Sequence, residues 1–511
     1  MKPHNLTTKS FFGVALIVLI SSGTLFGQAR YNTTQGLGMG NTGTAKVWGY
    51  QANFVNPANL AMPSRTSWTI GLFGGFSPNL GGDLANIALY NEYFTDGGVL
   101  TAERNMEAAT RWFGSGDDTY KQLGIGIDVT PFGISHQRGK WGAALAIRSR
   151  VLVDVGMSKG VFLSTTGINS TNFGSFQQFD LANEVLGYAE VSAGFGYRVW
   201  ENSESNEAGT IRVFAGIAPK YLVPIHYHSI ALESQLRVQD NPYLITHDFS
   251  YEIHALGQFA GDLIRFQQQR QQTGQAPEVD GFFDNSFDDA GGIRGFGFGM
   301  DIGATAEYYL GDFPFQSWFT RGSHKVTASI ALTDLGSISL TDAPARLFNS
   351  GIFEWDGLDV DQNRLENEFD SDFGEYFNNV VTDSIGNTIY LDLGSEELSS
   401  ISADLPTMVN FGLAYDVGKL SVAMDIGKGM NDRANNSSSA FFGLGAEFRL
   451  LNALPIQVGM RSGGSTSSAY TFGTGLNLRN FEFTLSLLTV PNSEANGSGL
   501  SMAMSGFVIR F

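Results

Sequence analysis

Hydrophobic residues recur along this chain with a period of two. From Phe296 to Leu310, apolar side chains occupy every even position, whereas the odd positions from 295 to 307 hold glycine, Asp301, Thr305 or Glu307. This alternation predicts a β-strand with one apolar face and one small or polar face. Strands in globular domains are usually roughly 5–6 residues long. The stretch is therefore too long for an average β-sandwich.

The same alternation returns in four further stretches, which are 141–148, 191–199, 440–450 and 470–479. Their small or polar faces carry charged residues such as Arg148 and Glu447. Burial of an unpaired charge in a dry core costs several kcal/mol, so these faces must meet water and the aromatic faces must meet something apolar. A closed barrel in a membrane satisfies both requirements, because its outer face contacts lipid and its inner face lines a lumen.

Counting the strands gives a test of this interpretation. Fourteen spans can be recognised, at 66–76, 121–134, 140–157, 184–200, 209–224, 294–311, 323–335, 406–417, 419–428, 439–450, 455–462, 468–479, 480–490 and 499–511. All long connections then fall on one side of the barrel, as expected for external loops. They are approximately 77–120, 158–183, 225–293 and 336–405. We predict an all-β fold, a transmembrane antiparallel β-barrel of about 14 strands over residues 65–511, with twelve or sixteen strands as alternatives.

The first thirty residues predict export. Lys2 and Lys9 precede the apolar run Phe11–Ile20, and small residues Gly27 and Ala29 follow at the positions expected for signal-peptide cleavage. The apolar run is too short to cross a bilayer. We therefore expect residues 1–29 to be a signal peptide and the protein to reside in the outer membrane of a Gram-negative bacterium.

Composition and charge narrow the functional classes. The 511 residues include no cysteine, 63 glycines, 50 acidic and 31 basic residues, for a net charge of −19. This balance argues against a nucleic-acid partner, which requires clustered Lys and Arg, and the lack of cysteine removes thiolate metal sites and cysteine nucleophiles. The chain also has no Gly-x-Ser-x-Gly, HExxH or P-loop motif, so we expect no enzyme activity, no cofactor and no metal.

Charged residues on the predicted inner faces are of both signs. They are interpreted as ion-pair networks along the wall of the barrel rather than as a catalytic pair. The predicted lumen charges are Arg148, Arg150, Asp154, Glu190, Arg198, Asp301, Glu307, Glu447 and Arg449.

Residues 30–64 precede the first strand and are rich in glycine and asparagine. They contain Gly36, Gly38, Gly40 and Asn41, followed by an Asn-Pro-Ala motif at Asn56, Pro57 and Ala58. This segment resembles the amino-terminal hatch of the long-chain fatty-acid transporter superfamily of outer-membrane barrels. The resemblance implies a fourteen-strand barrel whose lumen is plugged by residues 30–64; a disordered periplasmic leader is the alternative. Asn91–Thr101 looks like the first external region of Bacteroidota-type members.

The long loops offer sites for a ligand. Residues 99–113 have the apolar spacing of an amphipathic helix, which predicts a helix over the barrel mouth, and Phe259–Gln272 predicts a second, solvated one. In the resembled family such external helices are the first docking site for hydrophobic ligands. The candidates for ligand binding are Leu89, Tyr90, Tyr93, Phe94, Trp112 and Phe113. Packing of these side chains within their own loop is the alternative.

Two weaker metal hypotheses come from the same loops. Asp359 and Asp361 resemble the start of a calcium loop, but Arg364 stands where such a loop needs glycine, so a solvated acidic loop is the favoured interpretation. His226, His228 and His254 would share a face if residues 226–256 formed a hairpin turning near Asn241.

The strand pattern predicts only a barrel, and the family resemblance implies passive uptake of hydrophobic or amphipathic, fatty-acid-like small molecules through a plugged barrel. The expected partners are outer-membrane lipid and a hydrophobic small molecule. The alternative is a non-transporting barrel that anchors a surface or periplasmic protein partner.

Overall fold

The computed structural model describes residues 32–64, 66–95, 98–116, 119–203, 207–273, 293–322, 324–356, 366–368, 394–432, 436–451, 453–464, 466–478, 480–493 and 497–511. The predicted signal peptide and the Asp359–Asp361 motif lie outside these residues. In the part of the chain so described, no helix is long and apolar enough to cross a membrane.

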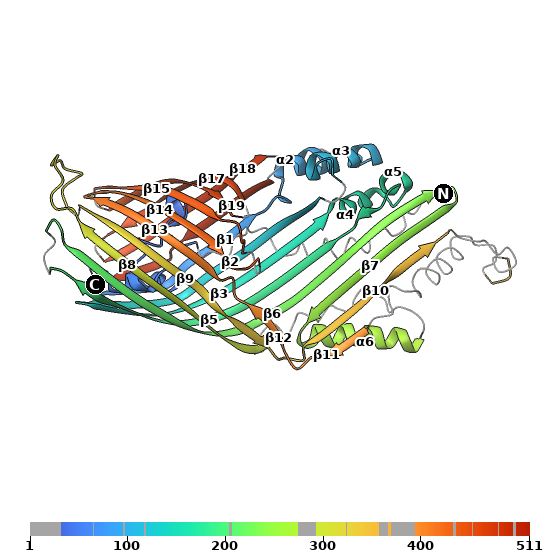
Figure 1. Cartoon of the computed structure of the whole chain (residues 1–511), viewed down its shortest axis with the longest axis horizontal. Coiled ribbons are helices and arrows are strands. Elements are labelled where there is room, and N and C mark those ends of the chain that lie inside the picture. Colours follow the sequence, from blue (N-terminus) through green and yellow to red (C-terminus); the bar gives the residue numbers. More distant parts are fainter. Residues whose placement is uncertain are drawn as a thin grey trace.

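Fourteen antiparallel strands close into a barrel, as the sequence predicts (Figure 1). Around the barrel, each strand pairs with the next in the order given, and the last pairs with the first. The first thirteen are β1 (Trp68–Gly81), β2 (Tyr120–Arg138), β3 (Trp141–Ser158), β5 (Leu181–Glu201), β6 (Ile211–Asp240), β8 (Gly295–Tyr309), β9 (His324–Leu340), β13 (Met408–Val417), β14 (Leu420–Gly429), β15 (Phe441–Leu450), β16 (Leu454–Gly463), β17 (Thr466–Asn477) and β18 (Phe481–Ser493). The fourteenth position is shared by β19 (Gly497–Met504) and β20 (Phe507–Arg510).

Closure of the barrel occurs where β1 meets β19 and β20. The sequence predicts one strand over 499–511, but the structure interrupts it between Met504 and Phe507. Opposite the interruption, Phe73 of β1 adopts a left-handed backbone with φ +50°, and its carbonyl accepts a hydrogen bond from the N–H of Gly506. The extra residue of the bulge in β1 thus faces the break.

The outer face of the barrel is apolar, as the alternation predicts. Large hydrophobic side chains on this face are well exposed, including Phe298 at 63%, Phe411 at 52% and Phe472 at 51%. Such a surface is stable only in contact with acyl chains. The rim that carries the short turns, for example between β2 and β3, is the periplasmic end.

The long barrel strands β3, β5 and β6 extend far beyond the opposite, external rim, together with strands that lie outside the barrel (Figure 1). The predicted loop 225–293 is largely regular structure: β6 continues to Asp240, and the chain returns as β7 (Tyr243–Ala255) before α6 (Gly257–Thr273). The predicted loop 336–405 contains β10 (Ala345–Trp355), β11 (Gly394–Glu397) and β12 (Ile401–Asp404). Strand β10 pairs with β7 and β11, whereas β12 pairs with β9. Period-two alternation is lost here because the β5–β6 register shifts at Gly187, which exchanges the two faces of β6.

Short helices cover the external end of this extension. They are α2 (Ile87–Tyr90), the single-turn π-helix η4 (Asn91–Thr95), α3 (Ala102–Phe113), α4 (Lys159–Leu163), the 3-10 turn η5 (Ser164–Thr166) and α5 (Ser170–Phe173), with β4 (Gln177–Gln178) following. The predicted amphipathic helix is α3: the Thr101 side chain accepts from the N–H of Arg104 at its start, and Gly114 with φ +88° ends it. The second predicted helix is α6.

Residues 32–64 lie inside the barrel (blue in Figure 1). They form three short 3-10 helices, η1 (Leu37–Met39), η2 (Gly49–Phe54) and η3 (Pro57–Ala61), and almost all of their side chains are buried. We call residues 32–64 the hatch.

Candidate functional site

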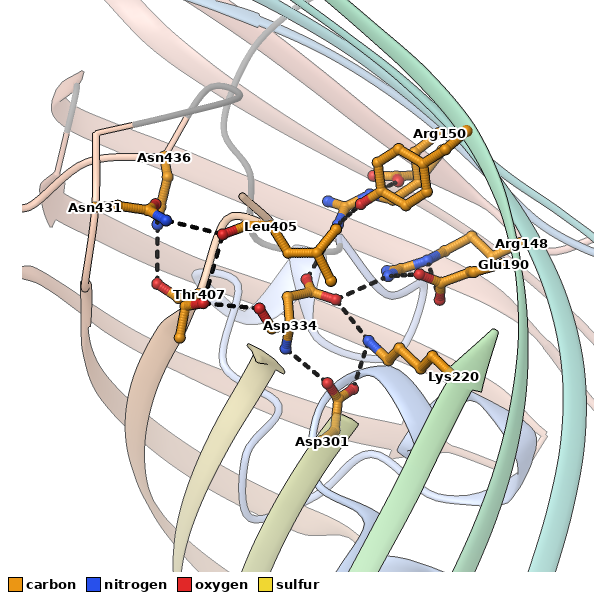
Figure 2. A network of polar contacts seen from close by, with 12 residues as sticks. Arg148, Arg150, Glu190, Lys220, Asp301, Asp334, Leu405, Thr407, Asn431 and Asn436 are labelled. Atoms are coloured by element: carbon orange, nitrogen blue, oxygen red, sulfur yellow. Dashed lines mark hydrogen bonds and ion pairs between the residues drawn. The ribbon is translucent and has the colours of Figure 1, made fainter. Parts of the chain in front are cut away.

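The lumen is crossed near its middle by a buried network of charged residues contributed by six strands (Figure 2). In its first pair, the Arg148 guanidinium on β3 donates two hydrogen bonds to the Glu190 carboxylate on β5, from Nε to Oε1 at 2.9 Å and from Nη2 to Oε2 at 3.0 Å. Both side chains are fully buried. Bidentate pairs of this kind fix geometry as well as charge.

The second arginine of β3 joins two more strands to the network. Arg150 donates from Nε to Asp128 Oδ1 at 2.6 Å, and from Nη1 to Asp334 Oδ2 at 3.0 Å and the Tyr188 hydroxyl at 3.1 Å. On the other side, Lys220 of β6 lies 2.8 Å from Asp301 Oδ2 and 2.5 Å from Asp334 Oδ1.

Asp334 is the centre of this arrangement. Its carboxylate contacts Arg150, Lys220 and, at 3.4 Å, Arg148 Nη2. Its backbone is left-handed (φ +53°) at a register shift between β8 and β9, and its N–H donates to Asp301 Oδ1 at 2.6 Å. Because the network contains three cations and four carboxylates without access to water, loss of one member leaves an uncompensated buried charge.

The hatch covers the network from the periplasmic side. The ring of Phe54 in η2 lies 4.4 Å from the Arg148 guanidinium carbon and 5.9 Å from Lys220 Nζ. Cation–π contacts of desolvated groups are worth up to about 2 kcal/mol or more. The plug and the wall are therefore coupled through Phe54.

An apolar cluster closes the lumen on the external side. Leu405, fully buried, lies directly above Asp334 (Figure 2), and its N–H donates to the Gly336 carbonyl. Thr407 Oγ1 donates to the Asp334 carbonyl at 2.8 Å, and Asn431 Nδ2 donates to the Leu405 carbonyl at 2.8 Å. The cluster comprises Leu152, Leu186, Tyr188, Leu222, Tyr227, Leu256, Ile338, Leu340, Ile401, Ala403 and Leu405.

The glycines of the predicted hatch motif meet the wall of the barrel. Thr471 of β17 accepts a hydrogen bond from the Gly40 N–H and donates one to the Gly38 carbonyl. A Cβ added to Gly38 would lie 2.8 Å from the Gly473 Cα, and Gly40 has φ +74°. Gly36 and Asn41 instead hold the hatch's own fold: the Gly36 N–H donates to Thr33 Oγ1, and Asn41 Nδ2 donates to Asn32 Oδ1.

The Asn-Pro-Ala motif starts η3 and binds it to β8. Asn56 Oδ1 accepts from the Ala58 N–H with Pro57 at the first helical position, while Asn56 Nδ2 donates to Thr305 Oγ1 at 2.9 Å. Thr305 in turn donates to Asn59 Oδ1 at 2.7 Å. This segment is thus fixed to the wall by fully buried polar bonds.

A carboxylate on β14 holds the middle of the hatch. Asp425 Oδ2 accepts from the Gly43 N–H, the Thr44 N–H and Thr44 Oγ1, at 3.0, 3.0 and 2.7 Å. Sequence reasoning did not single out Asp425, although its place on the small-residue face between Ala423 and Gly427 is the signal that could have found it.

The remaining predicted lumen charges form separate groups toward the periplasmic end. Glu307 contacts Lys325, and Arg198 contacts Glu201 at 2.8 Å. Glu447 contacts Arg449 at 2.8 Å. Asp154 lies apart from all of these, near the external end of β3, and is only half-buried. The structure thus brings Arg148, Arg150, Glu190 and Asp301 together and distributes the rest.

Several residues in or beside the network were not among the predicted site residues. Phe54 and Leu405 carry no charge, so no electrostatic signal marks them. Lys220 stands on the inner face of β6 and could have been found by extending the alternation. Asp334 lies where the register shift breaks the alternation of β9, so period alone does not place it.

The predicted ligand candidates on the external helices are mostly inaccessible. Leu89, Tyr93, Trp112 and Phe113 are at most 7% exposed and pack with Phe162 and Leu236 in the core beneath the helices. Only Tyr90 and Phe94 are exposed, at 54% and 41%. The four buried residues pack within the loops, which was the alternative to ligand binding. Their contacts hold the helices on the strands.

The external extension encloses a trough of about 950 Å³ between β5, β6, β7 and β10. Its lining mixes apolar residues such as Leu232 and Ile352 with polar ones, and the latter include the carboxylates Asp180, Glu233 and Asp248. Nearby, Arg346 of β10 donates a hydrogen bond to Glu252 of β7 at 2.6 Å, and this hydrogen bond lowers the pKa of the Glu252 carboxyl.

The three histidines predicted to share a face do not do so. Residues 226–255 form the expected hairpin, and His226 Nε2 lies 2.9 Å from His228 Nδ1. His254, however, pairs with Ser229 and therefore points to the other face. Within the described ranges, no group of three or more His, Cys, Asp or Glu could hold a metal ion.

The closed barrel, its apolar outer face and its plugged lumen define an outer-membrane β-barrel protein of a Gram-negative bacterium. Residues 57–489 match the family described as "Family of unknown function (DUF5723)", and the chain belongs to this family.

Comparison with curated proteins finds no match. Similar solved structures include the P. putida toluene transporter TodX, with 11% identity, 96% of this chain and 99% of that chain covered and a TM-score of 0.43. The Ralstonia pickettii toluene transporter TbuX has 12% identity, coverage of 94% and 99%, and a TM-score of 0.40. A Pseudomonas aeruginosa FadL homologue has 10% identity, coverage of 95% and 98%, and a TM-score of 0.38.

Proposed function

We propose that this protein is a gated outer-membrane channel for hydrophobic or amphipathic small molecules with an acyl chain, such as fatty acids. The observation that carries the proposal is the apolar cluster in the external half of the lumen, to which β3, β5, β6, β9 and β12 all contribute. A channel for polar solutes has a polar, water-filled interior. Apolar side chains that converge inside a barrel instead favour an apolar solute, because such a solute can enter between them and keep their surfaces away from water.

Passage requires movement, because the charge network and the hatch close the lumen below the cluster. An apolar solute gains nothing from a buried ionic layer, so we propose that it leaves the cluster only when Phe54 and the hatch shift away from Arg148. With no nucleotide-binding motif in the chain, the concentration gradient drives transport.

The experiment measures uptake of radiolabelled fatty acid by cells that carry the full-length protein. Leu405→Asn places an amide in the cluster and is expected to lower uptake several-fold. An apolar solute that enters the cluster would have to bury this amide without hydrogen-bond partners, which is unfavourable. Leu451→Asn, at an exposed position in the opposite rim, is the matched control and leaves uptake unchanged. Equal uptake by wild type, Leu405→Asn and cells lacking the protein overturns the proposal.

A second candidate function is favoured by the long extension of β6, β7 and β10 and by the trough that it encloses. A barrel that anchors a surface protein would present such a structure outside the membrane. Purification of one stoichiometric protein partner, together with fatty-acid uptake at background level, would favour this anchor over the channel.

A further inference from the structure

The periplasmic turn between β8 and β9, residues 311–322, folds back onto the outside of the barrel. The Phe319 carbonyl accepts a hydrogen bond from the Lys419 N–H at 2.8 Å, in the turn between β13 and β14. The Trp318 ring packs edge-on against Phe448 of β15, with ring centres 5.9 Å apart. Phe448 belongs to the outward face of β15, like Leu444, which is 38% exposed. The turn thus crosses the ends of β13 and β14 on the lipid side.

The outer surface of this turn is strongly apolar. Phe315 is 79% exposed, Trp318 63% and Phe319 37%, and Leu451 of the neighbouring turn is 79% exposed. Aromatic groups so exposed mark a contact surface. Since the patch continues the apolar outer face of β15, its cover is the membrane that covers that face.

The position of Trp318 completes a ring of aromatic residues at the periplasmic rim. Trp68, Trp141 and Trp200 stand at the rim ends of β1, β3 and β5, and each is between 37% and 51% exposed. Tryptophan is enriched where the hydrocarbon core meets the headgroups. The rim ends of β13 and β14 carry the aliphatic residues Val417 and Leu420, and the turn places the Trp318 ring beside them.

Two cations accompany the exposed tryptophan. Lys419 Nζ lies 4.6 Å above the Trp318 ring, and Arg321 is exposed in the same turn. In a chain with a net charge of −19, this pairing of cations with an interfacial aromatic stands out. We propose that this turn binds a phospholipid of the periplasmic leaflet. Trp318 and Phe315 insert at the boundary of headgroups and acyl chains, and Lys419 and Arg321 bind the phosphate.

Fluorescence quenching tests the position of the turn. The full-length protein is placed in phosphatidylcholine–phosphatidylglycerol vesicles with brominated acyl chains, and Trp318→Phe is compared with Trp355→Phe, which removes a tryptophan of the external strand β10. Because Trp68, Trp141 and Trp200 also lie at the interface, we expect Trp318→Phe to reduce the lipid-quenched emission by the share of one tryptophan, and Trp355→Phe to leave the lipid-quenched component unchanged. If Trp318 emission is instead quenched by aqueous iodide and not by bromolipid, the turn projects into the periplasm and the proposal is overturned.

Retained lipid tests the cations. Native mass spectrometry of the detergent-purified protein should show phosphatidylglycerol bound to wild type and at least threefold less bound to Lys419→Gln with Arg321→Gln. Lys428→Gln is the matched control, because Lys428 is exposed near the other end of the same strand, β14. Equal retention by all three proteins overturns phosphate binding. Loss of a bound periplasmic protein without any change in lipid would assign the surface to that protein instead, and would also overturn the proposal.

Discussion

The centre of the Phe54 ring lies 4.4 Å from the guanidinium carbon of Arg148, so the plug inside the barrel directly contacts the charge network of its wall. Arg148 is at the same time held by Glu190 and Asp334. Any displacement of the hatch therefore uncovers a buried cation, and any rearrangement of the network removes the surface on which Phe54 rests.

Replacement of Phe54 by leucine tests this coupling. Phe54→Leu keeps an apolar side chain but removes the π face, at a cost of up to about 2 kcal/mol. We expect amide hydrogen exchange in residues 32–64 to become faster by roughly tenfold, because the hatch opens more often. Phe441→Leu is the control: Phe441 stacks on Arg461 at 4.1 Å within the wall, so its loss should leave exchange in the hatch unchanged. Equal effects of the two variants would refute the coupling.

Removal of the central carboxylate should destabilise the barrel. Asp334→Asn leaves Lys220 and Arg150 without one of their partners in a buried site, and breaking such a buried pair costs about 3–5 kcal/mol. The temperature of barrel unfolding, followed by heat-modifiable gel mobility, should fall markedly. Asp404→Asn, at an exposed position of β12, should leave it unchanged. Adding Lys220→Met to Asp334→Asn should recover part of the loss, and a purely additive double variant would contradict the network.

A methyl group on the wall should displace the hatch. A Cβ at Gly142 of β3 would lie 1.8 Å from the Leu60 carbonyl oxygen, so Gly142→Ala forces η3 away from the wall. We expect the barrel to form while the hatch becomes accessible to added protease. Gly187→Ala on β5 is the matched control, because its Cβ would meet its nearest neighbour at an ordinary 3.7 Å. A hatch that stays protected in Gly142→Ala would show that it is not fixed at this point.

Acidic pH should loosen the external extension through His247 of β7. Burial, against the weaker opposing effect of Asp248, lowers the pKa of His247 to about 4, whereas the unfolded value is about 6.5. The neutral form is therefore favoured in the folded state. The stabilisation that neutral His247 contributes to the folded extension is complete above pH 6.5. It falls as the pH drops toward 4, by up to about 1.4 kcal/mol per pH unit.

Hydrogen exchange in β7 and β10, corrected for the intrinsic pH dependence, measures this loss. His247→Phe keeps a ring beside Phe179 and Phe249 and removes one titrating group, so its loss of protection between pH 7 and 4.5 should be clearly smaller than that of wild type. His136→Gln, at the periplasmic rim, should behave as wild type in these strands. An equal acid response in His247→Phe and wild type would assign the effect to other groups.

Period-two alternation was sufficient to predict the barrel, its strand number and its apolar outer face. It failed in the extension, where the β5–β6 register shift exchanges the faces of β6, and where β7 and β10 pair outside the membrane. The hatch motifs marked the segment that lies in the lumen, but the aromatic ligand candidates could not be distinguished from core residues, because burial of Trp112 and Phe113 depends on Phe162 from a different loop.

The sequence by itself determined which face of each strand a residue occupies, because side chains in a strand alternate whatever the neighbouring strand does. Only the tertiary structure decided which residues meet at one height in the lumen. Arg148 and Asp334 are distant in the chain, and the stagger of strands around a closed barrel, together with the bulge at Asp334, brings them together. Height along the barrel axis is set by register, and no local pattern in the sequence records it.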